Sequence, residues 1–148
     1  MTAGCITFDE IESRTESTVA LAIYARQVQA GFWAYAIGVP LLHILNTRLD
    51  DLKASLDTAF LNKLNDEQMI ELSDLLKQLH SRLERIVSTQ SQFKHVKKNL
   101  ERIEDSAEDL ESIVENIHLA VNQGFHKVVS SAISNLNVEA GESATMSH

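Results

Sequence analysis

Histidine, glutamate and cysteine are the residues of this 148-residue chain whose spacing could support metal binding or catalysis. Glu115 and His118 form an E-x-x-H pair, which places both side chains on one helix face, as helical bundles that hold two metal ions require. Such sites use the motif twice and add carboxylates from other helices, and this sequence has no second E-x-x-H. We therefore predict no metal and no cofactor, and a packing or polar-contact role for His118.

The other histidines are assigned by their neighbours in the sequence. His43 follows Pro40 among apolar residues, and we predict a core histidine with its hydrogen bonds satisfied; a pH-responsive group is the alternative. His80 and His95 fall at positions expected to be exposed, and His126 lies past Gly124. These three histidines are predicted to be solvated rather than catalytic.

Nucleophilic and phosphate-binding motifs are missing from the sequence. Cys5 is the single cysteine, so an intramolecular disulfide and a multi-cysteine metal site are both excluded. Glycine-rich phosphate loops, G-x-S-x-G and H-E-x-x-H do not occur. We predict that the chain is not an enzyme. The opening "MTAGCITFDEIESR" lacks the basic region of a secretory or transit peptide, and together with the lone cysteine it favours the cytoplasm.

Charge argues against a nucleic-acid partner. The chain has 21 acidic and 13 basic residues, a formal net charge of -8. Binding to phosphate backbones needs a concentrated basic surface. The one basic cluster, "KHVKK" at 94–98, is followed at once by the acidic "ERIEDSAEDLE". We expect these blocks to form ion pairs within or between helices.

The elements that must position these residues are long helices, because the chain has one proline and five glycines and its apolar residues recur at steps of three and four. We predict an all-α helical bundle with helices near 8–38, 40–61, 66–123 and 125–136. Thr7 and Glu10 have capping-box spacing, Pro40 can open a helix, and Asn65 can cap one. We expect residues 1–136 to form one domain and residues 137–148 to form a disordered polar tail.

Two apolar stripes of the coiled-coil type run through this sequence. The first lies in the helix near 40–61: Leu42, Leu45, Leu49, Leu52, Leu56 and Ala59. The second, which we call the interaction seam, is Phe93, Val96, Leu100, Ile103, Leu110, Val114, Ile117 and Val121, with Ala107 at the intervening position.

The register of the interaction seam bears on how many helices cover 66–123. Counting in sevens backwards from Phe93 reaches Ile86, Leu79 and Leu72, which favours one long bent helix. The alternative is two antiparallel helices, because the weak helix formers near 88–92 would permit a split.

An uncharged, aromatic-rich segment, "AGFWAYAIGVPLL" at 30–42, contains Phe32, Trp33, Tyr35, Ile37, Leu41 and Leu42. The charge-free interval around it, 27–47, has about the length of a bilayer crossing, but its continuous apolar part is about two thirds of that length. Its flanks also lack the basic asymmetry that orients a span. We predict that this segment is a central core element, with a docking or membrane-inserting surface as the alternative.

These observations support a non-enzymatic helical interaction protein. We expect a coiled-coil adaptor or regulatory subunit that forms a homo-oligomer through the interaction seam and binds another protein. The alternative function is a membrane-active or membrane-associated helical protein that uses the segment 30–42.

Overall fold

The computed structural model describes residues 6–27 and 34–140, with side chains up to residue 123 except at 34 and 35. Within these ranges the chain is helical apart from short turns, which confirms the all-α helical bundle. The elements are α1 (Phe8–Gln27), the π-helical turn η1 (Ala34–Gly38), α3 (Val39–Ser55), α4 (Thr58–Leu61), α5 (Asp66–Gln90), the 3-10 turn η2 (Lys94–Val96) and α6 (Lys97–Ala140).

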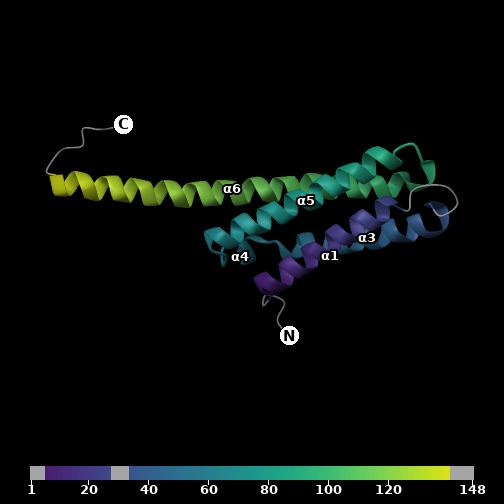
Figure 1. Ribbon diagram of the computed structural model, residues 1–148, viewed down its shortest axis with the longest axis horizontal. Coiled ribbons are helices and arrows are strands. Elements are labelled where there is room, and N and C mark those ends of the chain that lie inside the picture. Colours follow the sequence, from purple (N-terminus) through teal and green to yellow (C-terminus); the bar gives the residue numbers. More distant parts are fainter. Residues whose placement is uncertain (1–5, 28–33, 141–148) are drawn as a thin grey trace.

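The bundle is built from two helical hairpins that lie side by side (Figure 1). One hairpin is α1 with α3, and the other is α5 with α6; α1 packs along α5, and α3 packs along α6. The Gln90 side-chain amide donates to the Ala25 carbonyl at 3.4 Å, and the Asn46 side-chain amide donates to the Asn99 carbonyl at 3.1 Å. These contacts put the last residues of α1 and α5 at the same end of the bundle and join α3 to the start of α6.

Helix starts follow the residues that predict them. The Thr7 hydroxyl accepts a hydrogen bond from the Glu10 amide at 3.1 Å at the start of α1. Pro40 lies in the first turn of α3, where its missing amide hydrogen costs nothing. At α5, the Asn65 side chain accepts from the Gln68 amide at 2.8 Å and the Gln68 side chain accepts from the Asn65 amide at 3.1 Å. This reciprocal pair is a capping box.

The first two helices are shorter than predicted. Instead of covering 8–38, α1 ends at Gln27, residues 28–33 lie outside the described residues, and 34–38 form the π-helical turn. Instead of covering 40–61, α3 ends at Ser55, and the single turn α4 follows. The Asp57 carboxylate caps α4 by accepting from the Phe60 amide at 2.8 Å. The break turns Phe60 into the core and leaves Ala59 exposed, so the stripe of this helix ends at Leu56.

The prediction of one long helix over 66–123 is wrong, and the alternative split near 88–92 is confirmed. α5 ends at Gln90, and α6 begins at Lys97 and runs back along it. The hydroxyls of Ser88 and Thr89 both donate to the Arg85 carbonyl, at 3.2 and 2.7 Å. Such local bonds compete with the helix ladder and weaken it at this point. The seven-residue spacing of apolar residues continues from α5 into α6, because each of the two helices buries its own apolar stripe.

The end of α6 also differs from the prediction. We predicted that one helix ends near 123 and that a separate helix covers 125–136, but α6 continues through Gly124 to Ala140. Residues 137–140, assigned to the disordered tail, are therefore helical, while 141–148 lie outside the described residues. α6 has 44 residues against 25 in α5. Figure 1 shows its far part extending well past the rest of the bundle.

Leucine and isoleucine from α3, α5 and α6 fill the core. The contribution of α1 is smaller in volume, since its buried residues are Ile11, Thr15, Thr18, Ala22 and Ala25. Small side chains let α1 approach its neighbours closely. The largest fully buried side chains are Ile11, Leu42, Leu45, Leu49, Leu52, Leu72, Leu76, Leu79, Leu83, Ile86, Ile103 and Leu110.

Candidate functional site

The interaction seam is buried inside the single chain. Its central residues are Val96, Leu100, Ile103, Leu110, Val114 and Ile117, and all of them belong to the core. Phe93 and Val121, at the two ends, are partly buried against the same core. The helices that cover this stripe are α5 and α3 of the same chain. In this fold the predicted oligomer contact is therefore occupied by intramolecular packing.

The apolar segment 30–42 is described in part. Leu42 is fully buried, and Ile37 and Leu41 are partly buried. Phe32 and Trp33 lie outside the described residues, and the side chain of Tyr35 is outside them too. Among the residues described, no helix combines the length and the apolar character that a membrane crossing needs.

The E-x-x-H pair contributes a single cross-helix contact. His118 Nε2 lies 3.3 Å from the Ser73 hydroxyl oxygen, which joins α6 to α5, and Glu115 is exposed. Within the described ranges, no three histidine, cysteine, aspartate or glutamate side chains come together in a group that could hold a metal ion. The contact with Ser73 agrees with the polar-contact role predicted for His118.

The other histidines differ in surroundings. His43 is exposed, so the prediction of a satisfied core histidine is wrong: it points away from the stripe that begins at Leu42. His95 is exposed as predicted. His80 is partly buried rather than exposed as predicted, and its Nδ1 lies 3.7 Å from the Glu84 carboxylate one turn later on α5. The side chain of His126 lies outside the described residues.

Carboxylates on α1 and α5 face one another along the parallel contact of these two helices. Loss of solvent around the Glu12 carboxyl raises its pKa above the usual 4.5, and a hydrogen bond with Glu71 raises it further. The negative charges of Glu71, Glu16 and Asp9 act in the same direction. This side of the bundle is therefore acidic, and it disfavours anions.

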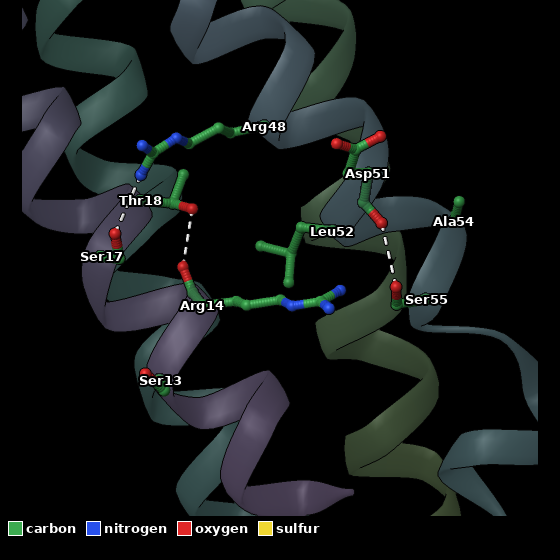
Figure 2. Close-up of a pocket in the computed structure, with 9 residues that line it drawn as sticks. All are labelled: Ser13, Arg14, Ser17, Thr18, Arg48, Asp51, Leu52, Ala54 and Ser55. Carbon is green, nitrogen blue, oxygen red and sulfur yellow. Dashed lines mark hydrogen bonds between the residues drawn. The ribbon is translucent and has the colours of Figure 1, made fainter. Parts of the chain in front are cut away.

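A polar groove lies between α1 and α3 (Figure 2). Its volume is about 580 Å³. The residues that line it are Ser13, Arg14, Ser17 and Thr18 from α1, and Arg48, Asp51, Leu52, Ala54 and Ser55 from α3.

Two arginine side chains from opposite walls extend across this groove (Figure 2). Arg48, on α3, donates from Nη1 to the Ser17 hydroxyl oxygen at 2.9 Å. Arg14, on α1, has its Nη2 4.0 Å from a carboxylate oxygen of Glu10. The Thr18 hydroxyl donates to the Arg14 carbonyl at 2.7 Å, within α1. The groove thus presents two guanidinium groups and several hydroxyls.

Sequence reasoning missed this groove, because its walls are brought together by the α1–α3 pairing. Ser13 and Ser17 lie one turn apart on α1, and Arg14 is beside them. Arg48 and Ser55 are two turns apart on α3. These spacings are a usable signal only once the antiparallel register of the two helices is known.

Comparison of the chain with protein-family models, with curated proteins and with solved structures finds no match.

Proposed function

We propose that this chain is a non-enzymatic helical interaction protein that associates with a second copy of itself through the far end of α6. The observation that carries the proposal is the length of α6, 44 residues beside a 25-residue neighbour. We call residues 126–140 the arm.

The contact between Ser73 and His118 fixes where the arm begins. α5 starts at Asp66, seven residues before Ser73, and α6 runs antiparallel to it. The start of α5 is therefore level with about residue 125 of α6. At 1.5 Å per residue, the remaining fifteen residues of α6 extend about 22 Å past α5.

The amino-acid pattern of this region supports a partner helix. Apolar residues recur at steps of three and four, as in the buried part of α6: Phe125, Val128, Val129, Ala132, Ile133 and Leu136. An isolated helix of about fifteen residues is marginal in water, and packing of an apolar face supplies most helical stability in proteins. A second helix laid along this stripe would bury it.

Charge favours a second copy of this chain as the partner. Between Glu115 and Glu139 the sequence has one Lys or Arg, Lys127, and no Asp or Glu. The whole chain carries a net charge of -8, so most of its surface would repel another copy. Two nearly neutral arms can meet without that repulsion, while the acidic bundles remain apart at the two ends.

The test is the molecular mass in solution of three proteins, measured by sedimentation equilibrium over a range of concentrations. The wild-type chain should approach twice its monomer mass of 16.5 kDa. Val129→Glu adds a charge to the apolar stripe and should shift the equilibrium to the monomer. Ser134→Glu adds the same charge off the stripe and should leave the dimer in place. A wild type that stays monomeric, or equal masses for the two variants, would contradict the proposal.

A second candidate function is membrane association through the segment 30–42. Two of the exposed large apolar residues flank it, Tyr24 at 51% and Ile44 at 44% exposure. The single tryptophan, Trp33, lies within the segment and reports on it directly. A blue shift of tryptophan fluorescence on addition of anionic and neutral vesicles would support this function, and an unchanged spectrum would argue against it.

A further inference from the structure

We infer that the groove between α1 and α3 binds a small organic phosphate. The first observation concerns which groups the Arg48 guanidinium contacts. Cations between α3 and α6 are paired with carboxylates: Lys53 Nζ lies 3.0 Å from Asp109, and Arg102 Nη2 lies 2.8 Å from Asp50. Arg48 instead donates to the neutral hydroxyl of Ser17. Within the described part of this acidic chain, its charge has no carboxylate at ion-pair distance.

Arg14 supplies a second cation from the opposite wall. Its contact with Glu10 is long, at 4.0 Å, and both side chains are 53% exposed, so this ion pair contributes little. Figure 2 shows the two arginine side chains crossing the groove from α1 and α3 in opposite directions. An anion in the groove would therefore meet guanidinium groups supplied by both helices.

Hydroxyl groups complete the set of donors. The Ser17 oxygen accepts from Arg48, which leaves the Ser17 proton free to donate to a bound oxyanion. Guanidinium groups present several N–H donors in a planar fork that matches phosphate oxygens. Arg48 and Ser17 together can thus contact two oxygens of one phosphoryl group.

The rest of the groove indicates an organic phosphate carrying hydroxyl groups. A volume of about 580 Å³ exceeds what a phosphate ion fills and falls in the range of small-molecule sites. Asp51 lies on the same wall as Arg48, and its carboxylate can accept hydrogen bonds from ligand hydroxyls. Ala54 is exposed and offers a small apolar surface to a short carbon chain.

The experiment is a titration of the full chain with glycerol 3-phosphate at constant ionic strength, followed by calorimetry and by amide chemical shifts. Saturable binding, with shifts on both walls of the groove, is expected. Arg48→Gln should weaken it at least about tenfold, because a charge-assisted contact to the phosphoryl group is lost. Arg85→Gln, an exposed arginine on α5 with the same change in charge, should alter affinity by less than about twofold.

Inorganic phosphate and glycerol are the comparison ligands. Inorganic phosphate should bind more weakly than the ester at the same residues, and glycerol should not bind. Thermal melting of both variants checks that the fold is intact. Absence of saturable binding, equal loss in the two arginine variants, or binding of glycerol as strong as that of its phosphate would overturn the proposal.

Discussion

Truncating Leu110 tests whether the interaction seam is core within one chain. This side chain is fully buried on α6, which packs against both α5 and α3. Leu110→Ala removes buried carbon atoms and leaves a cavity, and we expect a loss of about 3 to 5 kcal/mol in the free energy of unfolding. Domains of this size have a total of about 5 to 15 kcal/mol, so the loss would move the urea midpoint far down.

Leu119 is the matched control, since it lies on the same helix and is 58% exposed. Leu119→Ala should cost at most about 0.5 kcal/mol. Urea unfolding followed by circular dichroism measures both variants, at two protein concentrations. The difference between Leu110→Ala and wild type should be the same at both, because the seam is covered within the chain. Equal losses at the two leucines, or a Leu110→Ala effect that grows with dilution, would refute the reasoning.

Two other predictions concern polar groups. Asn46 is 1% exposed and donates to the Asn99 carbonyl, while its Oδ1 has no hydrogen-bond partner among the described residues. Asn46→Asp should destabilise the bundle by about 3 kcal/mol in urea unfolding at pH 7, and an unchanged midpoint would contradict this burial. The raised pKa of Glu12 means that the folded chain holds this proton to higher pH than the unfolded chain does, so its contribution to stability falls as pH rises above about 4.5. Glu12→Gln should therefore melt above wild type at pH 7, with the gap closing below pH 4.5, and a gap independent of pH would count against the Glu12–Glu71 contact.

Local signals predicted where most helices begin. The Thr7, Pro40 and Asn65 starts are confirmed because capping depends on residues within one turn. The interaction seam and the apolar stripe of α3 were predictable as buried faces, since apolar residues at steps of three and four indicate a covered helix face.

The partner of each stripe was not predictable. The same spacing suits a long coiled coil or a hairpin. We interpreted the unbroken seven-residue register across 88–92 as evidence for one helix, but two antiparallel helices keep the same register. The split depends on hydrogen bonds such as Ser88 to Arg85 and on the fit of Gln90 against Ala25, which lies far away in the sequence. The groove with Arg14 and Arg48 depends on the same kind of long-range pairing.

Amide hydrogen exchange at low and high protein concentration tests the central claim most directly, because it reports on both parts of α6 at once. The part of α6 inside the bundle, 97–117, should be equally protected at both concentrations. The arm, 126–140, should exchange fast when dilute and become protected at concentrations where the dimer forms. Two results would contradict the account: protection of 97–117 that appears only at high concentration, or an amide exchange rate in the arm that does not depend on protein concentration.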